Sequence, residues 1–337
     1  MSLRRSLLLT LAAIPAVFST LPAHAQGFIE RPDVQAFITE IAARNRFTEG
    51  ELYAAFARAT PQPRVIELIR PPSNPGVRSW QRYRTRFIEP IRISAGAKFW
   101  QENREALAQA SQRTGVPAEI IVGIIGVETI YGRYTGNFNT LSALATLAFD
   151  YPPRADLFRR ELESLFLLAR EQGRDVTGYT GSYAGALGLP QFLPSSVRNF
   201  AMDGDGNGKV DLDGSPRDAI FLQQHGWQSG TPIVRQARVA DAAKAQRLAD
   251  AGIEPAIDVS ILGEYGIEAE LPASALGQKI TLVDLVTPGE ATEWWLGFQN
   301  FYVITRYNRS SFYAMAVHDL AQAVKQEVDN RSAQAGK

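Results

Sequence analysis

The 337-residue chain contains no cysteine and only three histidines. The absence of thiols excludes disulfides, thiolate nucleophiles and cysteine-based metal sites, so stability must come from core packing. Neither sign of charge dominates, because 35 Lys and Arg face 35 Asp and Glu. This balance gives no reason to expect nucleic acid as a partner.

Histidine is also too scarce for several kinds of active site. After His24, only His225 and His318 remain. A Ser-His-Asp triad or a histidine-rich zinc site would therefore lack parts, and we expect structural roles for both residues.

Long apolar runs are absent except near the N-terminus. Arg4 and Arg5 precede an apolar stretch from Leu7 to Leu21, which ends in the small-x-small tripeptide Ala23-His24-Ala25. This pattern predicts a secretory signal peptide over 1–25, cleaved near Ala25. The alternative, a membrane anchor, is disfavoured because the apolar core falls short of the roughly 20 residues that span a bilayer. We therefore expect a soluble periplasmic protein.

The remaining chain changes character along its length. Apolar residues at helical spacing run from Arg31 to Gly115, with a break at 71–76. Ile91–Ala110 is expected to form one long helix, and alternating patterns at 257–261 and 280–286 predict strands. Five segments are expected: a signal peptide (1–25), a helical domain (26–115), a catalytic core (116–230), a small β subdomain (231–290) and a C-terminal helical segment that completes the core and helical domain (291–337).

Glu128 is the first candidate for chemistry. It directly follows the uncharged run from Ile120 to Val127, which is typical of a buried helix. Burial raises the pKa of a carboxyl group, and an acid that keeps its proton near neutrality suits a glycosidic leaving oxygen. The alternative is a glutamate at a helix end that reaches solvent or caps a neighbour.

Several sequence blocks around Glu128 carry a family resemblance. They are Gly126–Gly132, Leu141–Pro152, Gly178–Ser196 and Asn300–Asn308, together with Tyr83-Arg84 and Phe87. In this order they resemble the lytic murein transglycosylase B family, glycoside hydrolase family 103, over roughly residues 28 to 325. The resemblance implies an α+β, mainly α fold, with a lysozyme-like helical core, an additional helical domain and a small β subdomain.

The resemblance also implies a reaction. Members of the family cleave the β-1,4 bond between N-acetylmuramic acid and N-acetylglucosamine and leave a 1,6-anhydro ring. Glu128 matches the catalytic glutamate, which acts first as an acid and then as a base on the C6 hydroxyl of the same sugar. This internal nucleophile removes the need for the second carboxylate of ordinary glycosidases.

Further positions match residues that contact substrate in the family. Tyr83 and Tyr307 offer aromatic rings to sugar faces, and the alternative for Tyr83 is an ordinary core tyrosine. Ser182 and Gln191 on the glycine-rich loop match two further substrate contacts, and the alternative for this loop is a plain surface turn. The full set of expected substrate contacts is Tyr83, Arg154, Ser182, Gln191, Tyr307 and Asn308.

A metal loop is expected between residues 203 and 218. The segment resembles the first part of an EF-hand, with oxygen ligands at alternate positions and a glycine at the sixth. Gly214 replaces the usual closing acid, and the family closes a longer loop with a later aspartate. The expected calcium ligands are Asp203, Asp205, Asn207, the backbone of Lys209, and Asp218. The alternative is a series of Asp-Gly turns without metal. No cofactor is expected for catalysis.

Two departures from the family pattern stand out. Ile130 replaces an arginine of the family pattern. In addition, a few residues of the family pattern are missing at the junction of Ile220 and Phe221. The missing stretch normally carries an aromatic groove residue, for which Phe221 could substitute in part. The shortening keeps open a cell-wall-binding scaffold with little turnover, and a hydrolytic muramidase is a further alternative. The expected partners are peptidoglycan glycan strands and proteins of cell-wall synthesis or remodelling, and we expect a monomer.

Overall fold

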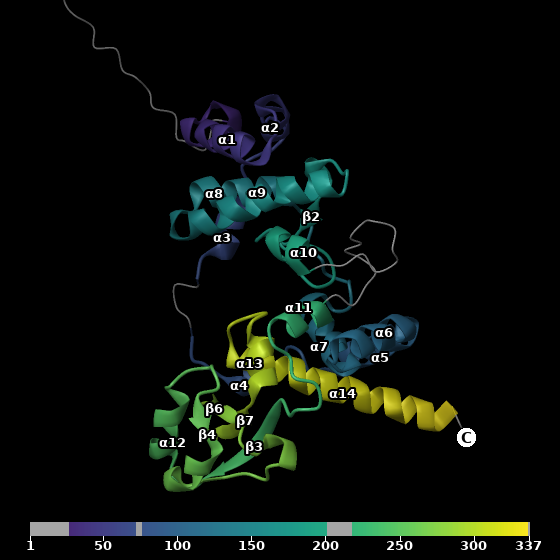
Figure 1. Ribbon diagram of the computed structural model, residues 1–337, viewed down its shortest axis with the longest axis vertical. Helices are drawn as coiled ribbons and strands as arrows, with labels where there is room; N and C mark the ends of the chain where they lie inside the picture. The colour runs from purple at the N-terminus through teal and green to yellow at the C-terminus, as the bar shows by residue number, and fades with distance from the viewer. Residues whose placement is uncertain (1–26, 72–75, 201–217, 336–337) are drawn as a thin grey trace, which may run out of the picture.

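The computed structural model describes residues 27–71, 76–200 and 218–335 (Figure 1). It confirms an α+β, mainly helical fold. The predicted signal peptide and the calcium ligands from Asp203 to Lys209 lie outside the described residues, and of Asp218 only the backbone, at the start of a helix, is described. No helix in the described ranges is long and apolar enough to cross a membrane.

One group of helices forms the upper half of the molecule in Figure 1. It contains α1 (Pro32–Asn45), α2 (Glu49–Phe56), α3 (Pro63–Ile69), α8 (Thr140–Asp150) and α9 (Ala155–Glu171). Proline occupies the first turn of α1, where its missing N–H costs nothing. Thr48 and Glu51 form a capping box that starts α2.

A second group of helices forms the lower half, together with the sheet. It contains α4 (Trp80–Arg84), α5 (Pro90–Glu102), α6 (Arg104–Thr114), α7 (Ala118–Thr129), α13 (Gln299–Thr305) and α14 (Ser311–Ala335). The short helix α11 (Asp218–Gln224) packs on α6 and α7 in this group, whereas α10 (Pro194–Phe200) packs on α9 in the upper group. The expected helical domain (26–115) thus contributes to both groups, since α3 packs on α8 while α5 and α6 pack on α7.

The expectation of one helix over Ile91–Ala110 is wrong. The chain breaks at Asn103, whose φ of −113° and ψ of 22° are not helical. The side-chain amide of Asn103 donates to the carbonyl of Phe99 at 2.9 Å. Such local bonds compete with helix continuation and separate α5 from α6.

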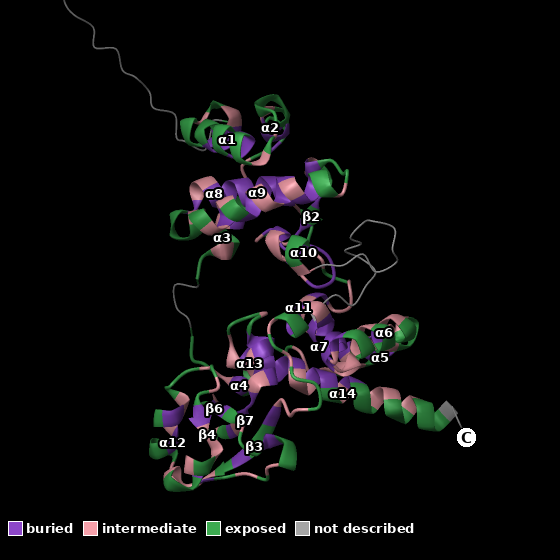
Figure 2. Cartoon of the chain, in the orientation of Figure 1, coloured by how far each residue is buried: buried purple, intermediate pink, exposed green. Residues whose placement is uncertain are grey.

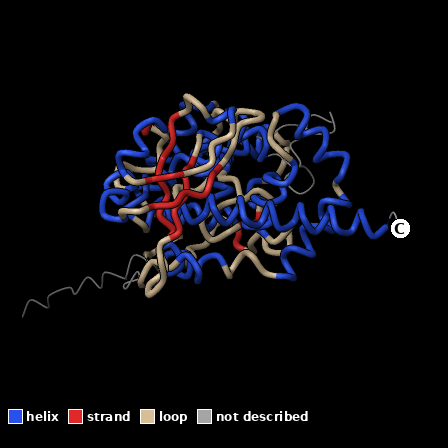
Figure 3. The backbone as a smooth tube through the Cα atoms, turned by 90° about the horizontal axis from the view of Figure 1, so that it is seen from below, coloured by secondary structure: helices blue, strands red, loops and turns tan. Residues whose placement is uncertain are grey.

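A five-stranded antiparallel sheet has the order β4-β6-β7-β3-β5. Its strands, red in Figure 3, are β3 (Val234–Val239), β4 (Ile257–Asp258), β5 (Ile267–Glu268), β6 (Lys279–Leu285) and β7 (Glu293–Gly297). β7 lies past the expected boundary at 290, so that part of the C-terminal segment is strand. A separate two-stranded ladder joins β1 (Phe138–Asn139) to β2 (Thr180–Gly181).

The two strand predictions had different outcomes. β6 confirms the pattern at 280–286. The pattern at 257–261 is a strand only over β4, because the Asp258 side chain accepts from the backbone N–H of Ser260 at 2.9 Å. This cap begins a 3-10 helix (Val259–Tyr265), which local sequence alternation does not reveal.

The sheet is buried on both faces along β6. Ile280 and Leu282 belong to a small core with α12 (Ala242–Ala249), whereas Val283 and Leu285 belong to the main core. Figure 2 shows buried segments in α7, α9 and α13. The sheet subdomain is therefore fastened to the helices that carry Glu128.

Candidate active site

Helix α7 is a buried rod that holds Glu128 in its last turn. Every residue from Ile120 to Gly126 is buried. Gly123 allows α14 to approach closely, because a Cβ there would lie 2.8 Å from the carbonyl oxygen of Val317. The backbone of Glu128 is therefore fixed by apolar packing on the buried part of the helix.

The chain reverses sharply just after Glu128. Ile130, Tyr131 and Gly132 have φ values of 51°, 57° and 89°, all in the left-handed region. The buried Thr129 hydroxyl accepts from the N–H of Gly132 at 3.0 Å and holds this turn. A β-branched residue such as Ile130 adopts this conformation only when its surroundings enforce it.

The buried guanidinium of Arg92, on α5, stabilises the end of α7 that leads into this turn. It donates to the carbonyl of Gly126 at 2.6 Å, near the C-terminal end of α7, where the negative end of the helix dipole stabilises a cation. The Tyr131 ring fills the space that Gly96 and Gly126 leave, since a Cβ on Gly126 would lie 2.5 Å from the tyrosine hydroxyl. Burial raises the pKa of Tyr131.

The carboxyl group of Glu128 is only partly exposed. Burial raises its pKa to about 7, and a hydrogen bond from the Tyr313 hydroxyl to Oε1, at 2.6 Å, partly offsets this rise. The sequence prediction of a protonated acid near neutrality therefore agrees with the geometry. The same bond also helps to orient the carboxyl group.

Three tyrosines lie around this carboxyl group. The rings of Tyr307 and Tyr313 stack with their centres 6.4 Å apart. Burial raises the pKa of Tyr83, and the negative charge of Glu128 raises it further. Tyr83 also packs on Phe312, at 5.6 Å between ring centres. Of the two tyrosines expected from the sequence, Tyr83 lies near Glu128, and Tyr307 stacks on Tyr313, whose hydroxyl donates to Glu128.

A small hairpin of the glycine-rich loop is attached to the end of α7. Leu187 and Phe192 exchange two backbone hydrogen bonds of 2.8 and 3.2 Å. The hydroxyl of Thr129 lies 3.2 Å from the carbonyl oxygen of Leu189, and the Tyr307 hydroxyl donates to the carbonyl of Pro190. These contacts bring the hairpin beside the last turn of α7.

Gln191 lies within this hairpin with a left-handed φ of 53°. Its amide nitrogen donates to the carbonyls of Thr135 at 3.1 Å and Gly188 at 3.0 Å. The amide oxygen is thereby oriented as an acceptor.

Ser182 shapes the loop that leads into the hairpin. Its hydroxyl oxygen accepts from the N–H groups of Ala184 and Ala186, at 3.3 and 3.1 Å. The hydroxyl hydrogen remains able to donate. Ser182 therefore forms a hydrogen-bonded turn, which is the alternative to substrate binding given above. Its hydroxyl hydrogen still remains as a donor for a substrate.

The described contacts do not join the other two expected residues to Glu128. Arg154 is exposed before α9, with its guanidinium 5.4 Å from the centre of the Phe158 ring. Asn308 is exposed in the turn after α13, and its carbonyl accepts from Ser310 at 2.7 Å. Their roles stay predictions.

The expectation that Phe221 presents a ring in place of the missing aromatic residue is wrong. Phe221 is 6% exposed and packs edge-on against Tyr307, with ring centres 5.0 Å apart. His225 stacks on Phe221 at 4.0 Å, in a structural role. These rings support Tyr307 from behind.

Sequence reasoning missed Tyr313, which lies 185 positions from Glu128. One signal was available: Tyr313 carries a hydroxyl within the buried run from Phe312 to Val317. A buried tyrosine hydroxyl requires a polar partner. The sequence does not reveal which partner it has.

No cluster of three or more His, Cys, Asp or Glu side chains suited to a metal occurs among the described residues. The proposed calcium ligands fall mainly outside that part of the chain. The acid site described above consists of the Glu128 carboxyl group, its tyrosines and the hairpin.

The chain is similar to several characterised proteins. The E. coli K12 protein named membrane-bound lytic murein transglycosylase B is 39% identical over 313 residues, which cover 88% of this chain and 84% of the relative. A soluble lytic transglycosylase, SltB1 of Pseudomonas aeruginosa, is 44% identical with a TM-score of 0.81, covering 88% of this chain and 99% of that one. The E. coli transglycosylase Slt35, solved in complex with calcium, is 38% identical with a TM-score of 0.77, over 88% and 94% of the two chains.

These structures share a lysozyme-like α+β fold with this chain. The family model described as the transglycosylase SLT domain matches residues 30–322, which include the whole site around Glu128. The chain therefore belongs to the lytic transglycosylase family of the SLT-domain type.

Proposed function

We propose that this protein is a peptidoglycan lytic transglycosylase that cleaves the β-1,4 bond between N-acetylmuramic acid and N-acetylglucosamine. The supporting observation is the Glu128 carboxyl group, whose pKa of about 7 keeps a transferable proton near neutrality. A single acid of this kind suffices when the second nucleophile belongs to the substrate.

The first step breaks the glycosidic bond. Protonated Glu128 gives its proton to the bridging oxygen, and the electron pair of the C1–O bond leaves with the N-acetylglucosamine product. Positive charge develops at C1 of the N-acetylmuramic acid, where the oxygen of the N-acetyl group of the same sugar stabilises it. Glu128 is now a carboxylate, and the Tyr313 hydroxyl stabilises its charge.

The second step restores the enzyme. The Glu128 carboxylate removes the proton from the C6 hydroxyl, whose oxygen bonds to C1 and forms the 1,6-anhydro ring. Glu128 is again protonated, and water takes no part. The balance between the burial of Glu128 and the Tyr313 bond suits a group that must both lose and regain a proton.

We assign the substrate contacts to side chains of the same region and to positions that match the family. Tyr83 and Tyr307 supply ring surfaces, the Ser182 hydroxyl a donor and the Gln191 amide oxygen an acceptor. Arg154 and Asn308 are assigned to more distant parts of the strand on the family resemblance alone. SltB3 of Pseudomonas aeruginosa, 29% identical over 89% of this chain, is described in complex with NAG-anhNAM-pentapeptide, a ligand of the kind that this reaction produces.

A structural calcium ion in the loop from Asp203 to Asp218 is part of the proposal. Its support is the oxygen-rich sequence pattern and the calcium complex of Slt35. The ion would cross-link the loop before α11 and supply no catalytic chemistry. Its test is thermal unfolding with calcium or with a chelator, where calcium is expected to raise the melting temperature. An unchanged melting temperature would overturn the assignment.

The cellular setting is proposed on the sequence. The signal-peptide pattern over 1–25 supports assignment of the mature protein to the periplasm in soluble form, and the expectation of a monomer is kept as part of the proposal. Its partners there would be peptidoglycan strands and proteins that build or remodel the wall.

The deciding experiment is mass spectrometry of products released from purified sacculi. Wild type is expected to release muropeptides with 1,6-anhydro ends, and Glu128→Gln at least about 1,000-fold fewer. Reducing ends instead would identify a hydrolytic muramidase. No release by either protein would identify a binding scaffold.

A further inference from the structure

The β-sheet has an open edge that the proposed reaction does not use. β3 pairs with β5 only at Arg238–Glu268 and Val239–Ile267. After Glu268 the neighbouring chain leaves the ladder. Among the residues that the structure describes, the stretch of β3 from Val234 to Ala237 therefore has β7 on one side and no strand on the other.

The backbone groups that face this open side can be assigned. The carbonyl of Ile233 accepts from Phe298 on the β7 side, at 3.0 Å, and the N–H of Ala240 donates to Gly266 on the β5 side, at 2.9 Å. Hydrogen-bonding direction alternates along a strand, so the N–H and carbonyl of Gln236 face the β5 side. There they have no hydrogen-bond partner among the described residues.

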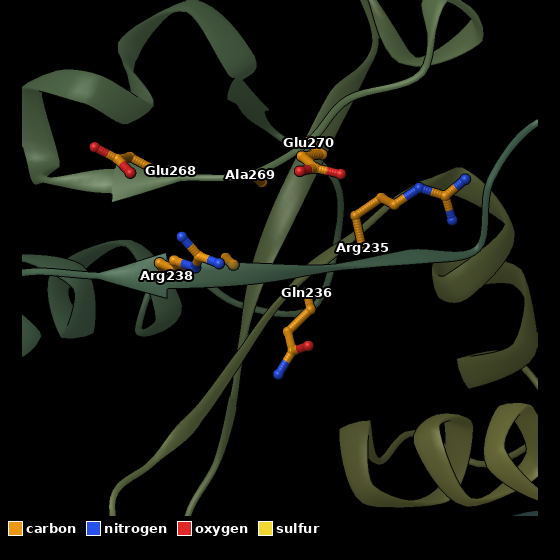
Figure 4. Close-up of a pocket in the computed structure, with 7 residues that line it drawn as sticks. Arg235, Gln236, Arg238, Glu268, Ala269 and Glu270 are labelled. Atoms are coloured by element: carbon orange, nitrogen blue, oxygen red, sulfur yellow. The ribbon is translucent and has the colours of Figure 1, made fainter.

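A cavity of about 770 Å³ lies along this edge. Figure 4 shows Arg235, Gln236 and Arg238 on β3, with Glu268 and Glu270 on the chain above them. The two arginines and two glutamates form no ion pair with other residues that the structure describes. The cavity therefore combines free backbone groups with charges of both signs.

The size of the edge limits its occupant. The open stretch has four residues and extends about 13 Å, whereas an ordinary protein strand has roughly five to six residues. The β3–β5 pair closes one end. At the other end the Arg235 guanidinium donates to the carbonyl of Val234 at 3.1 Å. A short peptide fits these limits better than a strand of a protein partner.

We propose that this edge binds the peptide stem of peptidoglycan. The inference rests on the proposed function, whose substrate carries short peptides with free carboxylate and ammonium groups. Arg235 and Arg238 would receive stem carboxylates, and Glu268 and Glu270 the ammonium group. The Gln236 backbone would pair with one peptide unit of the stem.

The test measures binding of a free stem pentapeptide, without sugar, to the full chain by calorimetry. The double variant Arg235→Glu/Arg238→Glu is expected to bind it at least tenfold more weakly than wild type. Gln236→Pro removes only a donor on the open side and should also weaken binding, while leaving the β3–β7 ladder intact. The matched control is Arg247→Glu on α12, an exposed arginine of the same subdomain outside the cavity, which should bind as wild type does.

A second arm separates this proposal from the proposed function. Glycan strands stripped of peptides should be cleaved equally by wild type and the double variant, and intact sacculi more slowly by the variant. Wild type that cleaves stripped glycan but does not bind the pentapeptide would overturn the stem site alone. Pentapeptide binding that the double variant and Gln236→Pro leave unchanged would do the same. Wild type that forms no anhydro ends from either substrate would overturn the proposed reaction instead.

Discussion

The two ends of helix α7 contrast in packing and backbone geometry. Residues from Ile120 to Gly126 are buried against α14 in regular helical geometry. Only a few positions later, Glu128 is partly exposed and Ile130 is left-handed. The buried part of α7 therefore supplies rigidity, while the incompletely buried end supplies reactivity. A carboxyl group in the buried part would hold its proton without access to a substrate.

The first prediction concerns the pH dependence of stability, which we expect at the reactive end of α7 and not at the buried end. Burial raises the pKa of Glu128 from 4.5 to about 7, so the folded state favours the protonated form. The stability from this preference is fully present below pH 4.5 and is lost as pH rises to about 7. Glu128→Gln removes the titration. Its unfolding free energy relative to wild type should therefore rise by up to about 3 kcal/mol between pH 4 and pH 8.

Urea unfolding at both pH values measures this difference. Glu119 in the first turn of α7 offers a control, since Glu119→Gln leaves the Glu128 titration in place. An unfolding free-energy difference between Glu128→Gln and wild type that does not vary with pH would contradict the burial of the acid.

The second prediction tests rigidity at the buried end. A methyl group at Gly123 would lie 2.8 Å from the backbone oxygen of Val317, so Gly123→Ala should lower the unfolding free energy by about 1–3 kcal/mol. Gly50 on α2 has open space around it, and Gly50→Ala should raise the unfolding free energy by about 0.5 kcal/mol. Denaturant titration of the two variants gives the comparison. Equal changes for both glycines would show that α14 does not approach α7 closely.

The third prediction tests the bond at the reactive end. Tyr313→Phe removes a donor that favours charged Glu128, so the pKa of that carboxyl group should rise further. The alkaline limb of the kcat/KM profile should move to higher pH with it, and kcat should fall about tenfold. Tyr302→Phe on α13 serves as control, because no hydrogen bond of its hydroxyl to a described residue is observed. A lower kcat with an unshifted pH profile would limit Tyr313 to packing.

The smallest effect concerns the turn after Glu128. Ile130 has a φ of 51°, a conformation that asparagine adopts more readily than a β-branched residue. Ile130→Asn should raise the unfolding free energy by about 1 kcal/mol, measured as a higher melting temperature. A lower melting temperature would mean that the apolar contacts of Ile130 outweigh its backbone strain.

The sequence predicted those parts of the site whose cause is local. An uncharged run of eight residues predicts a buried helix wherever it lies, and Glu128 at its end follows directly. The helix break at Asn103 and the 3-10 helix after Asp258 were not predicted. Both depend on one side chain choosing a nearby backbone group, a choice that periodicity does not record.

The helical periodicity, the candidate acid and the family pattern around it could be read from the amino-acid sequence, because they follow from apolar spacing and neighbouring residue types. The folded structure was needed to show that Tyr313 contacts Glu128, that Phe221 is buried behind Tyr307, and that β3 keeps an open edge. Hydrogen bonds and burial between distant segments depend on how helices and strands pack. No local pattern specifies that packing.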